Sequence, residues 1–258
     1  MTEKKPFYTD DELIRRVWDI EDIKDLMGRR VYYVANEWRR QELSDLWVTK
    51  PENRRTASFG RNWGFYVGME EISNYYVVKH DKDRQEILDA LCAENHDIEN
   101  KRENLGLGCL INHPISSSLV ELAIDGKTAK GMWYGISHET TALPGGHAEA
   151  RWMMEKIGVD FIKEDDDWKI WHMVIATDLT CEAGDDYGKQ PVYPEPGTDP
   201  VENEFGTPTI AMLIHNNTFN WWDNYPAQPE PYYTFTDDIS YGPEGISGLQ
   251  RLRREHYE

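Results

Sequence analysis

Two histidines bracket a predicted β-hairpin in the middle of the chain. His113 stands just before the first strand-forming run, and His138 stands at the far end of the second. Asp125-Gly126, between the two runs, is a strong short-range turn signal. Imidazole titrates near neutral pH, so a histidine pair in a mostly apolar sheet suggests proton transfer. We therefore expect His113 and His138 to serve as general acid and base.

The second strand of this hairpin presents an apolar face. Strand alternation puts Met132, Tyr134, Ile136 and His138 on one side of the sheet. A face that combines Met, Ile, Tyr and His would suit the wall of a pocket for an aromatic ligand. We expect this face to bind substrate, and we expect residues 139–147 to form a loop at the mouth of the sheet.

A second hairpin follows and turns in the acidic run 164–167. By the same alternation Trp168, Ile170 and His172 share a face of the last strand, so Trp168 and His172 are candidates to reach the cavity. Asp160, in the preceding strand, is a candidate buried carboxyl group whose pKa would be raised by burial. The alternatives are a hydrogen-bonded core histidine and a carboxylate on the other face of the sheet.

Helical spacing dominates the N-terminal part of the chain. Apolar residues recur with this spacing from Leu13 to Val34, and the stretch Asn36–Gln41 is expected to divide the region into two helices. Pro51 is expected to open a loop. A short hairpin is predicted within residues 56–67, and a further helix is predicted from Gly68 to about residue 95.

These N-terminal elements hold further site candidates. Tyr32 and Tyr33 are adjacent on the first predicted helix and point about 100° apart, so at most one faces a cavity squarely. A phenol there would hold a substrate oxygen or donate a proton, and the alternative is core packing. Trp63 and Tyr66, in the short hairpin, are candidate substrate-binding residues.

Charge and motif content exclude several classes of function. The 258 residues carry 47 acidic and 28 basic side chains, a net charge of −19, which disfavours nucleic-acid binding. No apolar run approaches the ~20 residues that cross a bilayer, and the first residues lack the apolar core of a signal peptide. We therefore expect a cytoplasmic protein with no membrane partner.

Metal and cofactor motifs are also missing from the sequence. The three cysteines are widely spaced, and neither an HExxH motif nor a His-x-His pair occurs. No glycine pattern of the phosphate-binding type and no GxSxG motif is present. We expect no metal, no cofactor and no disulfide framework.

The last 78 residues differ in composition from the rest. Residues 181–258 hold nine of the 13 prolines together with many aromatic residues. Prolines exclude a regular helix or a central strand, whereas disordered tails are usually poor in aromatics. We expect one domain over 1–180 and an ordered arm over 181–258. The arm would pack on its own sheet or on a neighbouring subunit, and Trp221, Trp222 or Tyr232 would close the pocket mouth.

Helices followed by a curved antiparallel sheet indicate an α+β fold. The segments IEDIKDLMGRR, FYVGMEEI, VELAIDGKTAKGMWY and VDFIKEDDDWKIWHM resemble the SnoaL-like branch of the nuclear transport factor 2-like superfamily over roughly residues 20–178. The resemblance implies a cone-shaped barrel in which the sheet wraps around the N-terminal helices and leaves a cavity. That fold hosts dehydratases, isomerases, cyclases, hydrolases and non-catalytic binders.

Two narrower resemblances point to elimination chemistry. In scytalone dehydratases one catalytic histidine precedes the hairpin and another stands at its far end, as His113 and His138 do here. That family also uses tyrosines near the first helix, where Tyr32 and Tyr33 stand, and a carboxylate near 36–39, where this sequence departs from the pattern. HPISSSLVELAIDGKTAKG and PEPYYTF are similar to the diarylpropane lyases, which act without a cofactor on lignin-derived aromatic dimers and release hydroxyl and then formaldehyde.

These observations together favour a metal-free, cofactor-independent lyase for a hydroxylated aromatic small molecule such as a lignin-derived dimer. A para-hydroxyl group can be deprotonated, and the resulting quinone methide replaces a cofactor as the electron sink. The alternatives are an isomerase or cyclase of an aromatic or polycyclic substrate and a non-catalytic small-molecule-binding module. The resemblance favours a homo-oligomer, with a trimer preferred to a dimer.

Overall fold

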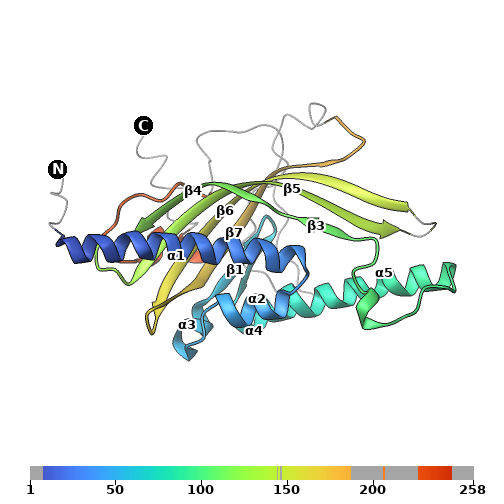
Figure 1. Cartoon of the computed structure of the whole chain (residues 1–258), viewed down its shortest axis with the longest axis horizontal. Helices are drawn as coiled ribbons and strands as arrows, with labels where there is room; N and C mark the ends of the chain where they lie inside the picture. The colour runs from blue at the N-terminus through green and yellow to red at the C-terminus, as the bar shows by residue number, and fades with distance from the viewer. Residues whose placement is uncertain (1–7, 144, 146, 187–205, 207–225, 246–258) are drawn as a thin grey trace.

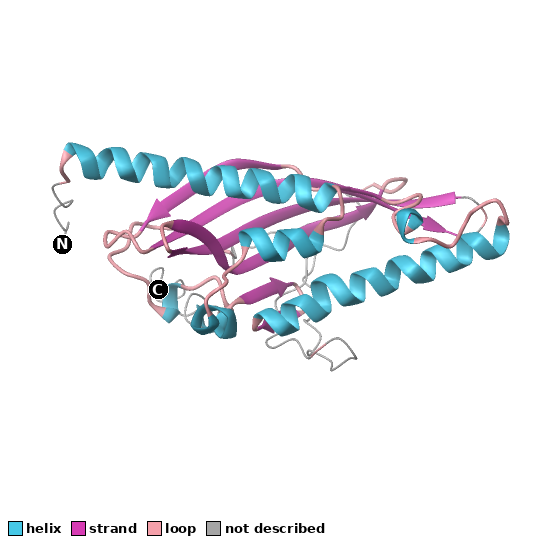
Figure 2. Ribbon diagram, turned by 60° about the horizontal axis from the view of Figure 1, so that its bottom comes forward, coloured by secondary structure: helices cyan, strands magenta, loops and turns pink. Residues whose placement is uncertain are grey.

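The computed structural model describes residues 8–143, 145, 147–186, 206 and 226–245. A curved seven-stranded sheet carries helices along one face, and its edges do not pair to close a barrel (Figure 1). Figure 2 shows the long first helix and the second helix lying against that face. The structure confirms the predicted α+β fold with a curved, mostly antiparallel sheet and N-terminal helices.

Two helices form the N-terminal layer, as the sequence predicts. The first begins with a capping box in which the Thr9 side chain and the Glu12 side chain satisfy each other's backbone N–H groups. The break between the two helices lies at 36–38, inside the predicted stretch. Pro51 was expected to open a loop but begins a short helix, because its fixed φ suits a first helical turn. The helical elements are α1 (Asp10–Ala35), α2 (Arg39–Leu46), α3 (Pro51–Thr56), α4 (Met69–Ser73), η1 (Asn74–Lys79), α5 (His80–Glu94), η2 (Arg102–Asn104) and η5 (Asp237–Ile239).

The segment η1 is a π-helix that joins α4 and α5 without a break. A π-helix bonds each carbonyl to the N–H five residues on, and such segments are rare and frequent at functional sites. Here it presents two adjacent tyrosines, Tyr75 and Tyr76, together with Lys79 toward the space between helices and sheet.

All strand pairs in the sheet are antiparallel except that of β1 with β7. The order is β2-β1-β7-β6-β5-β3, and β4 also pairs with β5. The strands are β1 (Ser58–Arg61), β2 (Gly64–Val67), β3 (Leu110–Asn112), β4 (Ile115–Leu122), β5 (Thr128–Leu143), β6 (His147–Glu164) and β7 (Asp167–Glu182).

Both predicted long hairpins are present. Gly126 adopts a φ of +71° in the β4–β5 turn, the left-handed conformation that glycine tolerates best. The expectation of a loop over 139–147 is wrong, because β5 and β6 stay paired from Thr128↔Ile162 to Leu143↔His147. Glu139 is therefore a strand residue with a defined face.

A β-bulge at Trp171 overturns the predicted face of the last strand. Asp160 pairs with His172 and Phe161 pairs with Ile170, so Trp171 is the extra residue between two pairs. Trp168 and Ile170 consequently pack in the main core, whereas His172 lies on the opposite face of the sheet. Simple alternation fails here because the bulge changes the phase of the strand.

The main hydrophobic core lies between the helices and the sheet face that they cover. Each large side chain fully buried there contributes roughly 1.5–3 kcal/mol. Members of this core with essentially no exposed surface include Ile23, Met27, Trp47, Ile72, Phe161, Ile170 and Met173. No helix in the described ranges is long and apolar enough to span a membrane.

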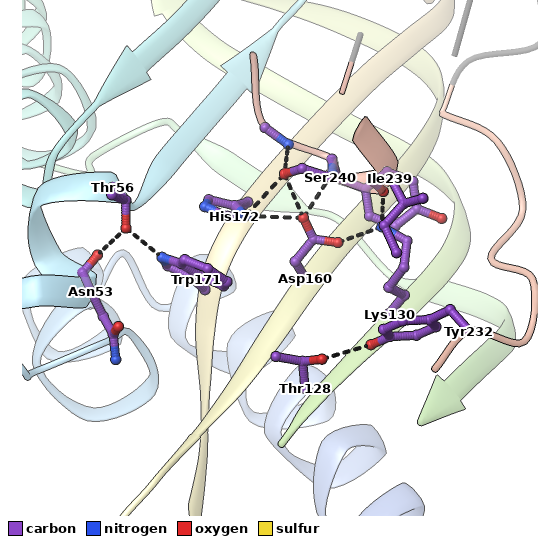
Figure 3. A network of polar contacts seen from close by, with 12 residues as sticks. Asn53, Thr56, Thr128, Lys130, Asp160, Trp171, His172, Tyr232, Ile239 and Ser240 are labelled. Carbon is purple, nitrogen blue, oxygen red and sulfur yellow. Dashed lines mark hydrogen bonds and ion pairs between the residues drawn. The ribbon is translucent and has the colours of Figure 1, made fainter. Parts of the chain in front are cut away.

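Residues 226–245 lie on the other face of the sheet, where a polar cluster fastens them. The Lys130 ammonium donates to the Asp160 carboxylate at 2.6 Å, and the Tyr241 backbone N–H and the Ser240 hydroxyl donate to the same carboxylate at 2.7 and 3.0 Å (Figure 3). His172 Nδ1 lies 3.0 Å from Asp160 as well. We call Lys130, Asp160, His172, Ser240 and Tyr241 the outer clasp.

Burial would raise the pKa of Asp160, but the Lys130 ammonium and the hydrogen bond from His172 outweigh burial and hold the pKa below its usual range. The sequence-based expectation of a raised pKa at this position is therefore wrong. A carboxylate that is already ionised and fully bonded acts as an anchor for the C-terminal segment.

Replacement of Asp160 tests the outer clasp. Asp160→Asn leaves the Lys130 ammonium, only 6% exposed, without its carboxylate, and we expect a loss of about 3–5 kcal/mol in the free energy of unfolding. Asp165→Asn is the matched control, because Asp165 is an exposed carboxylate paired with Lys50, and it should change that free energy by less than ~0.5 kcal/mol. Urea denaturation measures both. If the Asp160→Asn and Asp165→Asn variants have the same free energy of unfolding, the outer clasp does not hold residues 226–245 in place.

Candidate active site

A cavity of about 170 Å³ lies between the helices and the inner face of the sheet. Its wall combines basic, acidic and aromatic side chains from both layers and is far more polar than the sequence suggests. The lining residues are Arg30, Val34, Arg39, Phe59, Arg61, Tyr75, Tyr76, Lys79, His80, Asp83, His113, Glu139, Ile157 and Ile175.

His113 lies between two carboxylates at the sheet side of this cavity. Its Nδ1 is 2.9 Å from Glu155 Oε2, and its Nε2 is 2.8 Å from Glu139 Oε1. Glu155 is fully buried and also accepts a hydrogen bond from the Ser137 hydroxyl at 2.7 Å, whereas the Glu139 side chain is 38% exposed. The arrangement has an inner carboxylate that orients the imidazole and an outer one that faces the cavity. We call Glu155, His113 and Glu139 the proton relay.

Backbone geometry places His113 over Glu155. The residue follows β3, and the chain then bends at Pro114 into β4, so both short strands pair with β5. Gly135 of β5, the cross-strand partner of Glu155, lies directly under this bend. A Cβ atom at Gly135 would come within 3.1 Å of the Pro114 carbonyl oxygen, so the missing side chain allows the close approach.

The two carboxylates favour a protonated imidazole. Burial lowers the pKa of His113, but hydrogen bonds to Glu139 and Glu155 outweigh burial and hold the pKa above its ordinary value. Burial likewise raises the pKa of Glu155, yet the hydrogen bond from His113 and the Arg61 charge bring it down to about 2. The relay thus holds an imidazolium between two ionised carboxylates, which makes His113 a proton donor near neutral pH.

The helix side of the cavity has its own buried ion pair. Arg30 Nε lies 3.1 Å from Glu42 Oε1, and the Tyr76 hydroxyl donates to Glu42 Oε2 at 2.6 Å. The Arg39 guanidinium lies over the Tyr76 ring, 4.5 Å from its centroid. Two arginines and a phenol therefore share one small region of the wall.

Tyr75 supplies a neutral phenol to the cavity. Burial raises the pKa of Tyr75 to about 12, so its hydroxyl stays protonated and can donate a hydrogen bond. Tyr66 stacks on the Tyr75 ring at 4.0 Å, and the Trp63 ring meets it edge-on at 6.2 Å. Trp63 and Tyr66 were predicted to touch substrate, but neither lines the cavity. They hold Tyr75 in place.

The predicted histidine pair does not share a pocket. His138 follows Ser137 and precedes Glu139, which both point inward, so it lies on the outer face and packs against the Trp152 ring at 4.2 Å. Tyr134 is 46% exposed on that same face. Met132 is buried on this face as well, opposite Gly158. The expectation that this apolar face forms the pocket wall is wrong, because the inner face of β5 is the polar one.

The predicted tyrosines of α1 also lie outside the cavity. Tyr32 is 71% exposed, and the Tyr33 hydroxyl donates to Asp45 at 2.9 Å on the helix surface. The residues of α1 that do face the cavity are Arg30 and Val34, one turn apart.

The remaining candidates are structural or lie outside the described residues. Asp160 and His172 belong to the outer clasp, on the face opposite the cavity. Trp168 donates its indole N–H to Asp19 at 2.9 Å within the core. Tyr232 does not line the cavity, since its hydroxyl contacts Thr128 at 3.1 Å beside the β4–β5 turn (Figure 3). Trp221 and Trp222 lie outside the described residues.

Sequence reasoning missed most of the polar wall. Glu139 was assigned to a loop, and Arg39, Arg61 and Tyr75 were not considered. One signal was available in the alternation Ser137-His138-Glu139 of β5. Ser137 and Glu139 share one face of the strand and Ile136 and His138 share the other, so a polar cavity could have been placed on the Ser137 and Glu139 face.

Solved structures of other proteins are similar to part of this chain. A hexachlorocyclohexane dehydrochlorinase, LinA-type3 from Novosphingobium barchaimii, is 15% identical over 67% of this chain and 95% of that chain, with a TM-score of 0.43. A nuclear transport factor 2-like protein with a cystatin-like fold from Novosphingobium aromaticivorans is 16% identical over 67% and 92%, with a TM-score of 0.40. No curated protein matches the sequence.

The sequence model of the SnoaL-like domain matches residues 15–174, from the second turn of α1 to the middle of β7. This stretch includes every residue that lines the cavity except Ile175, which follows it directly. Because the match covers more than half of the chain, the protein belongs to the SnoaL-like domain family.

Proposed function

We propose that this protein is a metal-free lyase that eliminates water, and then formaldehyde, from a small hydroxylated aromatic molecule. The observation that carries the proposal is the proton relay, in which an imidazolium at the cavity wall is held between a buried and a half-exposed carboxylate. A positioned acid with a pKa raised from its ordinary value suits protonation of a leaving hydroxyl group at neutral pH.

One imidazole serves both steps of such a reaction. In the first step the ionised para-oxygen of the substrate supplies an electron pair, the benzylic C–O bond breaks, and His113 Nε2 gives its proton to the departing hydroxyl, which leaves as water. The product of this step is a quinone methide. In the second step neutral His113 takes the proton of a neighbouring hydroxymethyl group, the C–C bond breaks, formaldehyde leaves, and the electron pair restores the ionised phenol.

The size of the cavity limits what enters it. An engineered apolar cavity of about 150 Å³ binds benzene, so a cavity of about 170 Å³ accepts one substituted ring. For a two-ring lignin-type substrate the reacting ring would occupy the cavity and the second ring its mouth. The aromatic side chain of Tyr75 and the apolar Ile157 and Ile175 provide the walls that such a ring would contact.

Replacement of His113 tests the relay directly. With a diarylpropane diol or a related dimer as substrate, His113→Ala should lower kcat by about 10²–10⁴-fold, the usual contribution of a positioned general acid or base. His138→Ala is the matched control, because this histidine stands on the opposite face of the same hairpin and should leave kcat unchanged. Steady-state release of formaldehyde measures both. An equal loss in the two variants would contradict the assignment.

The pH dependence of the reaction tests the role of the outer carboxylate. His113 acts as an acid in its protonated form, so kcat/KM should fall as pH rises through a pKa that lies above the ordinary histidine value. Glu139→Gln removes one hydrogen-bonded charge that raises this pKa, so the alkaline limb of the profile should move to lower pH.

The control for this profile is Glu149→Gln, which removes a half-buried carboxylate of the same hairpin that pairs only with Arg151 among the described residues. It should leave the alkaline limb in place. A Glu139→Gln profile that coincides with the wild-type profile would show that His113 does not set this limb.

A further inference from the structure

Arg39 is the one lining cation without a carboxylate partner in the described part of the chain. Each of the other strongly basic groups of the wall has an acidic neighbour. The pairs are Arg30 with Glu42, Arg61 with Glu155, Lys79 with Asp83, and His113 with Glu139. The wall therefore carries one uncompensated positive charge, in a chain whose net charge is −19.

The environment of Arg39 makes this charge costly without a ligand. Its Nε atom is buried and donates to no acceptor among the described residues. Among the described residues, the partner of its guanidinium is the face of the Tyr76 ring, with 4.5 Å from Cζ to the ring centroid. A buried polar N–H without an acceptor destabilises a protein, and more so when the group is charged. Such a cost is offset when a ligand supplies the missing anion.

We propose that Arg39 binds an anionic oxygen on the aromatic ring that enters the cavity, either an ionised phenol or a carboxylate. The inference rests on the proposed function for the identity of the cavity as the active site, and it names the substrate class that this site selects. A guanidinium presents several N–H groups in one plane and matches an anionic oxygen or a carboxylate better than an ammonium does.

The position of Arg39 agrees with this role. It begins α2 on the helix side of the cavity, whereas His113 belongs to the sheet side. A ring held by its anionic oxygen at Arg39 would extend toward the relay with its benzylic carbon. An ionised phenol at that place would be the electron donor that the first elimination step requires, so Arg39 would both bind the ring and favour its ionised form.

Binding of simple one-ring probes to the full chain tests the proposal without turnover. The probes are para-nitrophenolate, benzoate and the neutral benzyl alcohol. Isothermal titration calorimetry measures their affinities at a pH where para-nitrophenol and benzoic acid are both ionised. At least one anion should bind the wild-type protein more tightly than benzyl alcohol does. Arg39→Gln should lower the affinity for that anion by about 10- to 100-fold and leave the affinity for benzyl alcohol unchanged.

Two further variants complete the experiment. Arg40→Gln is the matched control, because Arg40 is 57% exposed and pairs with Asp81 outside the cavity, and it should not alter anion binding. Arg39→Lys keeps the positive charge and should keep the preference for an anion over benzyl alcohol, which a purely structural role of Arg39 would not predict.

Each outcome decides one point. Tighter binding of para-nitrophenolate identifies an ionised phenol as the ligand group, and tighter binding of benzoate identifies a carboxylate. Equal affinities for all three probes, no binding of either anion, or equal losses in Arg39→Gln and Arg40→Gln would overturn the proposal. The proposed lyase activity is tested separately, because probe binding requires no reaction. Full activity in His113→Ala would contradict the proposed lyase mechanism and would leave the binding result as it stands.

Discussion

The buried carboxylate of Glu155 is the interaction on which the inner side of this molecule depends. It stands in the middle of β6 and contacts His113 between β3 and β4, Ser137 of β5, Arg61 of β1 and Thr177 of β7. An isolated ionised carboxylate would be far too costly at this depth, so the surrounding strands must all supply donors at once. The fold and the relay therefore require each other.

The distribution of charge adds a second constraint. The chain is strongly acidic overall, with a net charge of −19, whereas the cavity wall brings together arginines, a lysine and a protonated histidine. Pairing with carboxylates, two of them buried and two partly exposed, compensates nearly all of this positive charge, so the cavity remains polar without a large net field. Among the described residues Arg39 is the one uncompensated cation of the wall, and in our proposal it determines which ligand charge the cavity accepts.

Much of the architecture could be predicted from the sequence, and most of the site could not. The break between α1 and α2 and the Gly126 turn follow from local spacing and turn chemistry, which the residues display directly. The inner wall depends instead on long-range register. The bulge at Trp171 reverses the phase of β7 and leaves no mark in the local sequence. The extension of β5 past His138 turns Glu139 inward, and the local alternation of polar residues indicates it only weakly.

His113 was identified because its position before a hairpin is visible in the sequence, but its partners come from strands 26 and 42 residues further along the chain. Arg39 escaped notice because a basic residue at the start of a helix is ordinarily solvated, and only the packing of Tyr76 beneath it reveals a buried nitrogen. The burial of a side chain and its hydrogen-bond or ion-pair partners depend on the tertiary structure, so residue type alone predicts them poorly.

The π-helical segment between α4 and α5 links chain length to the shape of the cavity wall. A π-turn takes up one extra residue while the α-helices on either side keep nearly the same phase, so removal of a single residue from Asn74–Lys79 would restore regular α-helix and leave α5 nearly in place. The side chains within the segment itself would change position, and Tyr75, Tyr76 and Lys79 line the cavity. In this protein a change of one residue in length would therefore alter one wall of the ligand cavity without any substitution.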